Sequence, residues 1–261
     1  MWKYLVILVT LPLPAFAGAW VQEAGRSLIS TQITLYSTNE FFDIEGNTTS
    51  QSRFHKEELN VYGEYGWNNT LTFGTNLFLN RASQNGSTNI GIADSELFAR
   101  LLVWKDNHSV LSLQPLIKLP SLYEQSGSPR GGTDSTDIEL SVLFGHSFRL
   151  LSETDYVDAR IGYRTRNNGL NAQWRTDIAY GITLTDTLQI ISAMRVITAT
   201  QLEAETFSNN GELDYDLSKA ELSALYHLND GQAVQFSYFA HIAGRQTGSG
   251  QGISVGFTQR F

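Results

Sequence analysis

The stretch from Asp137 to Phe148, DIELSVLFGHSF, alternates between apolar and polar residues with a period of two. Its large apolar residues share one face: Ile138, Leu140, Val142, Phe144 and Phe148. Its polar and small residues share the other: Asp137, Glu139, Ser141, Gly145 and Ser147. Because successive side chains of a strand point to opposite sides, this pattern predicts a β-strand with one apolar and one polar face.

The same pattern recurs along the chain after Gly25 and predicts twelve strands. They cover residues 26–37, 56–67, 71–82, 92–105, 109–119, 136–148, 155–165, 173–183, 187–199, 215–228, 232–243 and 251–261. Strands of soluble sheets usually have about five or six residues, whereas a tilted strand needs about nine to eleven to cross a bilayer. The lengths therefore predict an all-β fold, an antiparallel up-and-down transmembrane β-barrel of about 12 strands.

The predicted connections alternate in length, which supports the barrel. Short turns fall at 68–70, 106–108, 150–153, 184–186 and 229–231, and they are rich in Asn, Asp and Gly. Longer polar connections fall at 38–55, 83–91, 120–135, 166–172, 200–214 and 244–250. In bacterial barrels the short turns are periplasmic and the long loops are extracellular. A soluble β-sandwich also alternates, but its strands are shorter and its loops need not alternate in length.

Both ends of the chain carry features of an exported barrel. Residues 1–17 have a positive Lys3, an apolar stretch and Ala15-Phe16-Ala17, which predict a signal peptide cleaved before Gly18. A cut after Ala19 is the alternative. The apolar stretch is too short for about 30 Å of hydrocarbon, so we do not expect it to be an anchor. Residues 18–261 then form the barrel, and its terminal Phe261 resembles the signal that barrel-assembly machinery reads.

Aromatic residues gather near both ends of the predicted strands. Those beside the short turns or at the terminus are Trp67, Trp104, Phe148, Tyr226 and Phe261. Those near the long connections are Tyr36, Phe54, Trp174 and Tyr215. Aromatic girdles mark the two membrane interfaces of outer-membrane barrels, so we expect both sets to lie at an interface.

Composition excludes several other classes of protein. The formal net charge is −8, whereas a nucleic-acid binder is usually basic. The chain has no cysteine, so it contains no disulfide, thiolate metal site or thiol nucleophile. No Gly-rich nucleotide loop follows a strand, and no two histidines have metal-ligand spacing. We therefore expect no cofactor and no nucleic-acid partner.

The polar strand faces supply the candidate functional residues. If the apolar faces meet lipid, the pore-lining set includes Glu64, Glu96, Arg100, Lys118, Glu139, Arg160, Arg164, Arg175, Asp177, Arg195, Lys219 and Glu221. In one interpretation the bases form a track that favours anionic solutes, such as acidic sugars, in a narrow pore. In the other, bases and acids pair and mostly close the lumen, since buried charges must be paired or wet. The near-equal number of both signs favours partial occlusion.

An enzyme is the weakest of the functional hypotheses. Some barrels of this size are lipid hydrolases, which need a serine within hydrogen-bond reach of a histidine. His146 and Ser147 are neighbours in one strand and point to opposite faces, so these two side chains cannot meet. His108 and Ser109 have the same difficulty. We therefore expect a non-enzyme, and a hydrolase would require a Ser–His contact near the bilayer edge.

Three stretches resemble a known family of barrels. They are Gly18-Ala19-Trp20, residues 58–66 (ELNVYGEYG) and residues 71–79 (LTFGTNLFL). They resemble Xag-type small proteobacterial outer-membrane proteins, most closely over 18–82. The resemblance implies a barrel in the outer membrane, some members of the family being encoded beside exopolysaccharide glycosyltransferases. It identifies no functional residues.

The leading hypothesis is a narrow outer-membrane channel or transport-associated protein for small polar or anionic solutes. In it, the connections 38–55, 120–135 and 200–214 gate the outside. The alternative is a non-conducting surface or scaffold barrel linked to exopolysaccharide export, which would use its loops. The expected partners are outer-membrane lipid and lipopolysaccharide, the assembly machinery through Phe261, and a small polar solute or a polysaccharide.

Overall fold

The computed structural model describes residues 18–122, 129, 135–152, 154–167, 169–202 and 214–261. The predicted signal peptide, residues 1–17, lies outside this part of the chain. The strands are β1 (Ser27–Phe42), β2 (Thr48–Asn68), β3 (Leu71–Gln84), β4 (Ser87–Ile92), β5 (Ser95–Lys105), β6 (Ser109–Leu119), β7 (Asp137–Phe148), β8 (Asp155–Thr165), β9 (Gln173–Thr183), β10 (Leu188–Ala199), β11 (Asp216–Asn229), β12 (Gln232–Arg245) and β13 (Thr247–Arg260).

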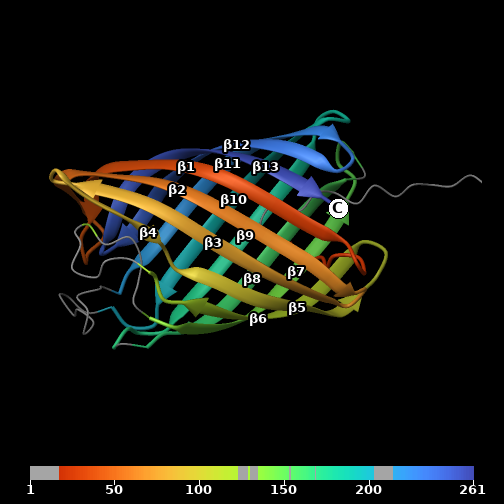
Figure 1. Ribbon diagram of the computed structural model, residues 1–261, viewed down its shortest axis with the longest axis horizontal. Helices are drawn as coiled ribbons and strands as arrows, with labels where there is room; N and C mark the ends of the chain where they lie inside the picture. Colours follow the sequence, from red (N-terminus) through yellow and green to blue (C-terminus); the bar gives the residue numbers. More distant parts are fainter. Residues whose placement is uncertain (1–17, 123–128, 130–134, 153, 168, 203–213) are drawn as a thin grey trace, which may run out of the picture.

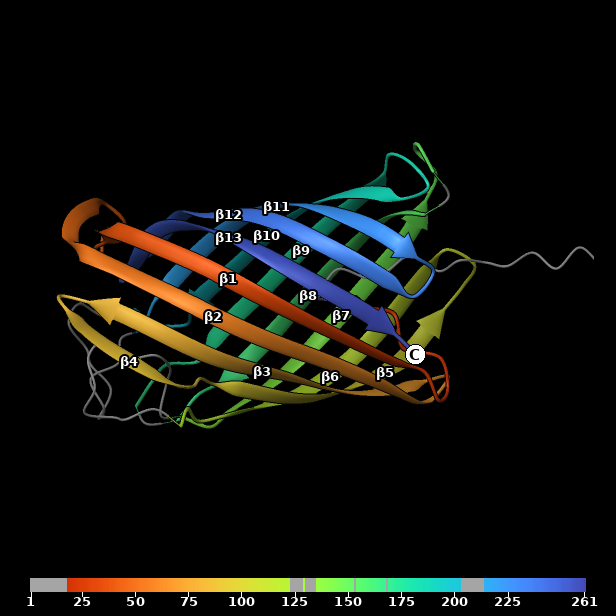
Figure 2. The same cartoon turned by 45° about the horizontal axis from the view of Figure 1, so that its top comes forward.

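These strands form one closed antiparallel barrel (Figures 1 and 2). Apart from β4 and β5, strands that follow one another in the chain pair, and β1 pairs with β13 to close the sheet. β4 and β5 pair in succession with the outer and inner parts of β3, so together they make one interrupted strand. The described segments therefore make a barrel of twelve strands, which confirms the predicted fold.

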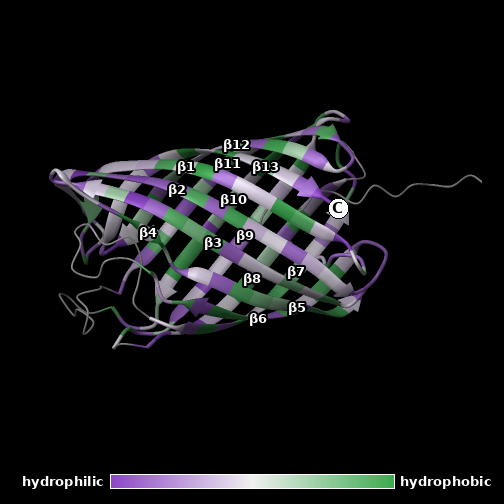
Figure 3. Cartoon of the chain, viewed as in Figure 1, coloured by the Kyte–Doolittle hydropathy of each residue, from purple (hydrophilic) through white to green (hydrophobic). Residues whose placement is uncertain are grey.

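Apolar side chains cover the outside of the barrel. Large exposed ones come from strands all around it, among them Ile33, Leu140, Ile161, Phe236 and Val255. Figure 3 shows hydrophobic and hydrophilic residues alternating along the strands in view. A continuous apolar surface of this extent is stable against lipid and not against water. The protein is therefore a multi-pass outer-membrane β-barrel.

The aromatic residues beside the short turns lie on this outer surface. Trp67, Trp104 and Tyr226 lie near the strand ends at the short turns, Phe261 pairs with Ser27 at the start of β1, and all four are exposed. Short turns face the periplasm in bacterial barrels, so we call the end with the short turns the periplasmic end and the opposite one the extracellular end. No helix among the described residues is long and apolar enough to span a membrane.

Three of the long extracellular connections predicted from the sequence are instead strand hairpins. β1 and β2 extend to Phe42 and from Thr48, so most of 38–55 is paired strand. The segment 83–91 turns at Asn85-Gly86, and 244–250 turns at Gln246, both through positive φ angles. The tips of these hairpins are mainly polar, as in 48–52 (TTSQS) and 84–89 (QNGSTN), so the apolar alternation fades although the strand continues. The predicted connections 120–135 and 200–214 fall largely outside the described residues.

Candidate functional site: the charged lumen

The twelve predicted pore-lining residues all belong to inward faces of the strands, and each takes part in an ion pair. Glu64 pairs with Arg100, Glu96 with Arg164, and Lys118 with Asp94 and Asp137. Glu139 contacts Arg160, Arg164 and Arg175, while Asp177 contacts Arg160. Arg195 and Lys219 share Glu221. The structure thus gathers these residues, although whether a solute passes along them stays a prediction.

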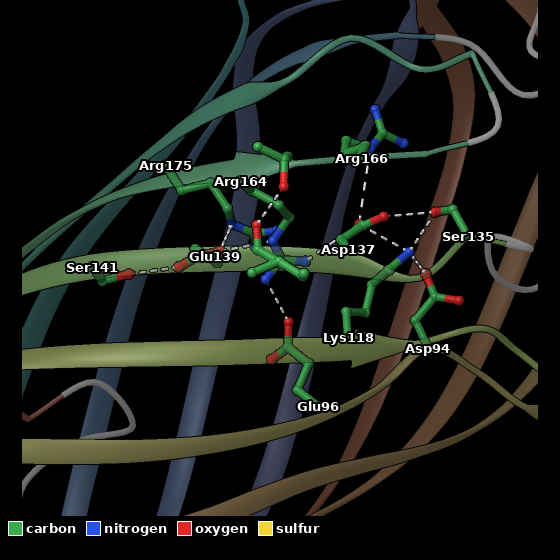
Figure 4. Close-up of polar contacts among 12 residues, drawn as sticks. Asp94, Glu96, Lys118, Ser135, Asp137, Glu139, Ser141, Arg164, Arg166 and Arg175 are labelled. Atoms are coloured by element: carbon green, nitrogen blue, oxygen red, sulfur yellow. Dashed lines mark hydrogen bonds and ion pairs between the residues drawn. The ribbon is translucent and has the colours of Figure 1, made fainter.

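Glu139 on β7 is the centre of the largest ion-pair group (Figure 4). Its side chain is fully buried, and its Oε2 lies 2.7 Å from Nε of Arg164 and 3.8 Å from Nε of Arg175. It also accepts hydrogen bonds from Arg160 and, over 2.6 Å, from the Ser141 hydroxyl. Arg164 on β8 also reaches Glu96 on β5, past β6 and β7, at 2.7 Å. Such a group satisfies charges that would be costly to bury alone.

A second group lies beside it, nearer the extracellular end. Nζ of Lys118 is 3.1 Å from carboxylate oxygens of both Asp94 and Asp137. Arg166 binds Asp214 at 3.0 Å and lies 3.9 Å from Asp137. Figure 4 shows the two groups as neighbours on the same part of the wall. Alternation alone places Asp94 and Asp137 inward, but Arg166 belongs to a predicted loop and no sequence signal marked it.

Glu96, Arg160 and Arg175 of this group also line a cavity of about 740 Å³, which extends to Phe41, Gln51 and Thr247 at the extracellular strand ends. One of its walls carries Arg175, Arg195 and Lys219 from β9, β10 and β11, and Lys56 extends from β2. The side chains of Arg195 and Lys56 are 33% and 30% exposed, whereas those of Glu221 and Glu58, their acidic neighbours, are 10% and 16% exposed. The cavity is therefore lined by more accessible positive than negative groups.

The wall next to the cationic one, from β12 and β1, is aromatic. The rings of Tyr36 and Phe239 are stacked with centroids 6.2 Å apart, and His241 lies 5.0 Å from Tyr36. Nζ of Lys219 sits 4.1 Å above the centre of Phe239, a cation–π contact. Tyr36 and Phe54 line this cavity, so their predicted placement in an outer girdle is wrong. Both residues lie at inward positions of their strands. Because side chains alternate between the two faces of a strand, the position along the strand decides which face a residue occupies, and its distance from a predicted loop does not.

The lumen also contains buried apolar groups that the expected polar lumen did not include. Leu28, Tyr62, Phe98 and Leu116 form one buried cluster on inward faces. Each of them is a large apolar or aromatic residue on an otherwise polar strand face. This break in the alternation is the signal from which the sequence could have identified the cluster. Ala19 and Trp20, which precede β1, pack there as well. Between this filling and the upper cavity, beside Asp158 and Asp177, lies a void of only about 20 Å³, enough for about one water molecule.

A serine–histidine contact does occur, although not between chain neighbours. Oγ of Ser109 on β6 is 2.8 Å from Nδ1 of His146 on the adjacent β7. The two residues are cross-strand partners at the periplasmic edge of the barrel. Among the described residues, no group hydrogen-bonds the other ring nitrogen of His146. Nucleophilic catalysis needs a third group that orients the histidine, so the pair alone is not a catalytic triad. Nor do the described residues contain a cluster of side chains suited to hold a metal ion.

No protein-family model matches this chain, and no curated protein matches it by sequence. The likeness to solved structures is in the fold. The COG4313 outer membrane channel from Pseudomonas putida F1 is 12% identical, with a TM-score of 0.77, over 95% of this chain and 99% of that one. The fold is that of small outer-membrane barrels.

Two porins share the fold less closely. The NanC porin is 11% identical with a TM-score of 0.57, and the match covers 88% of this chain and 98% of that one. The KdgM porin in complex with disordered oligogalacturonate is 9% identical with a TM-score of 0.54, over 90% of this chain and 99% of that one. At these identities the likeness establishes the architecture, while the Xag-type resemblance of residues 18–82 is not tested by it.

Proposed function

We propose that this protein is a narrow outer-membrane channel for small anionic polar solutes that enter from the extracellular side. The observation that carries the proposal is the open cavity, in which the cations Arg175, Arg195, Lys219 and Lys56 remain accessible while their acidic neighbours are more deeply buried. A cavity with low-dielectric walls concentrates an ion of the opposite sign. The fold shared with outer-membrane channels supports the same proposal.

The solutes that fit this cavity best are carboxylated sugars. Arginine and lysine heads bind carboxylates, and the apolar face of a sugar ring packs on aromatic rings such as Phe239 and Tyr36. Amides of Gln32, Asn60 and Asn76 on the same side offer hydrogen bonds to hydroxyl groups. The KdgM porin, whose structure was obtained with an oligogalacturonate, has the same architecture.

The test is the reversal potential of the purified protein in a planar bilayer under a salt gradient. We expect anion selectivity, and we expect Arg175→Gln, Arg195→Gln and Lys219→Gln together to reduce or reverse it. Arg81→Gln is the matched control, because Arg81 pairs with Glu57 on the outer surface and does not line the cavity. Cation selectivity of the wild type, or an unchanged potential in the triple variant, would contradict the proposal.

The second candidate is a non-conducting scaffold barrel connected with exopolysaccharide export. The resemblance of residues 18–82 to Xag-type proteins supports it, as does the filled periplasmic half of the lumen. In that case, a protein shown to be folded by heat-modifiable gel mobility would give no current at all. Its function would then reside in the extracellular hairpins.

A further inference from the structure

The segment that precedes β1 enters the barrel instead of remaining outside it. Gly18 and Ala19 are buried, and Ala19 packs against Val110 and Leu143 of the barrel wall. The ring of Trp20 meets Tyr156 edge to face, with centroids 5.9 Å apart. Residues 18–24 form no strand of the barrel. The segment therefore occupies the lumen as a separate element.

Side chains of the wall bind the backbone of this segment. The hydrogen bonds run from Ala19 N–H to Asp158 Oδ2 (2.7 Å), from Ser112 Oγ to the Ala19 carbonyl (2.7 Å), from Arg100 Nη1 to the Trp20 carbonyl (2.9 Å) and from Gln22 N–H to Thr72 Oγ1 (2.8 Å). All of these wall residues are buried and come from β3, β5, β6 and β8. The Gln22 side chain also donates to Glu64 at 2.5 Å. Hydrogen bonds to backbone groups recognise an extended peptide.

Two glycines of the wall make room for the same segment. A Cβ at Gly66 would lie 2.1 Å from the carbonyl oxygen of Glu23, and one at Gly145 would lie 2.6 Å from the indole ring of Trp20. Neither contact is sterically tolerable, so any other residue at these positions would displace the segment. The wall is thus complementary to the segment in both shape and hydrogen bonding, and these two observations are independent.

We infer that the inward faces of β3 and β5–β8 form a peptide-binding site, which this chain's own residues 18–24 occupy as a releasable plug. This inference rests on the proposed channel function. Because the segment forms no strand, its departure breaks no part of the barrel's sheet. It would uncover Asp158, Ser112, Thr72 and Arg100, polar groups that water can solvate. Asp158 also lines the small void below the upper cavity, so a vacated site would extend that cavity toward the periplasm.

The first test changes the wall in the full chain. Gly66→Ala together with Gly145→Ala is expected to unseat the plug and raise single-channel conductance several-fold. Gly63→Ala is the control on the same strand, since a Cβ there meets only Thr75 at an ordinary 3.6 Å. Conversely, Gln22→Cys with Thr72→Cys should lock the plug under oxidising conditions and release it on reduction. The natural chain has no cysteine to interfere.

A second measurement reports the plug without relying on current. Ala19→Cys, buried in the seated segment, should react slowly with a water-soluble maleimide and much faster when combined with the two glycine substitutions. Heat-modifiable gel mobility verifies that each variant is folded. If labelling accelerates while the bilayer stays silent, the plug is releasable and the channel proposal is overturned. Two results would overturn the plug inference and leave the channel proposal intact. One is that Ala19→Cys is labelled equally fast with and without the two glycine substitutions. The other is that the oxidised Gln22→Cys, Thr72→Cys variant conducts like the wild type.

Discussion

At the residue scale, Glu139 shows how the lumen accommodates charge. This one buried carboxylate contacts three arginines that come from β8 and β9, and Arg164 continues the network to Glu96 on β5. The outward Glu57–Arg81 pair is different, because both side chains are more than two-fifths exposed to the surroundings. A glutamate–arginine pair therefore contributes differently to stability in the lumen and on the outer surface.

We predict that Glu139→Gln lowers the free energy of unfolding by about 3–5 kcal/mol, since it leaves buried guanidinium groups without their carboxylate. Glu57→Gln, the same chemical change on the outer surface, should cost less than about 1 kcal/mol. Urea titration of the protein in detergent micelles, followed by tryptophan fluorescence, measures both. Equal effects would show that the lumen is much wetter than the buried Glu139 side chain indicates.

Asp106, in the periplasmic turn between β5 and β6, gives a prediction about pH. Its Oδ1 accepts the backbone N–H of His108 at 2.8 Å and of Ser109 at 2.6 Å. These two hydrogen bonds hold the pKa of the Asp106 carboxyl below its usual value. A depressed pKa means that the carboxylate stabilises the turn above the unfolded-state pKa and loses this effect as the pH falls through the folded-state pKa.

We therefore expect the turn to loosen as the pH drops below about 4, the ordinary range for Asp. The amide proton chemical shifts of His108 and Ser109 should titrate together by NMR in the wild type. In Asp106→Asn, whose side-chain oxygen still accepts hydrogen bonds but does not titrate, this acid-induced change should disappear. A transition that persists in the variant would assign it to another group.

At the element scale, the hairpins extend the barrel beyond the membrane on the extracellular side. β3 and β4 pair from Leu79 with Ile92 up to Gln84 with Ser87, around the turn Asn85-Gly86. Both turn residues have positive φ, 54° and 78°, a combination that matches the twist of a two-residue hairpin. The alternation of apolar residues fades in this region because water surrounds both faces, and a pattern based on apolar residues therefore ends the strand too early.

We predict that Gly86→Ala destabilises this hairpin by about 1–2 kcal/mol, since a Cβ is unfavourable in the left-handed region. Amide hydrogens of β4 should then exchange roughly 5- to 30-fold faster, by the usual conversion of free energy to equilibrium constant. Ser87→Ala, one residue later and extended, serves as the control. Unchanged exchange in β4 would mean that contacts other than the turn hold the hairpin.

At the scale of the whole molecule, the barrel is divided along its axis. The extracellular half contains the cavity with its cationic and aromatic walls, and members of the Glu139 group are part of its lining. Toward the periplasmic end, the lumen is filled by apolar side chains and residues 18–24. Around all of this runs the apolar outer surface (Figure 3). Its extent along the axis defines where the bilayer lies.

We predict that Val142→Arg, at the middle of β7 on the outer surface, destabilises the barrel by about 2–4 kcal/mol, the range for a cation at the bilayer midplane. Thr88→Arg is the control, because threonine has nearly the same shape as valine and Thr88 lies on the exposed β3–β4 hairpin. It should change stability by less than about 0.5 kcal/mol, as surface substitutions usually do. Unfolding from lipid vesicles in urea compares the two, and similar losses would mean that the bilayer reaches the hairpin.

The sequence by itself determined the period-two alternation, and with it the twelve strands, their antiparallel order, the outward apolar surface and the inward position of residues such as Glu139 and Arg195. These follow from local geometry, because strand parity fixes which face a residue occupies. Only the tertiary structure decided which charges meet, since Arg164 and Glu96 become partners through barrel closure and stagger. The same holds for Tyr36 beside Phe239, for Ser109 beside His146, and for residues 18–24 inside the lumen. Each of these contacts joins positions far apart in the chain, and its formation depends on the register between strands, which no local pattern encodes.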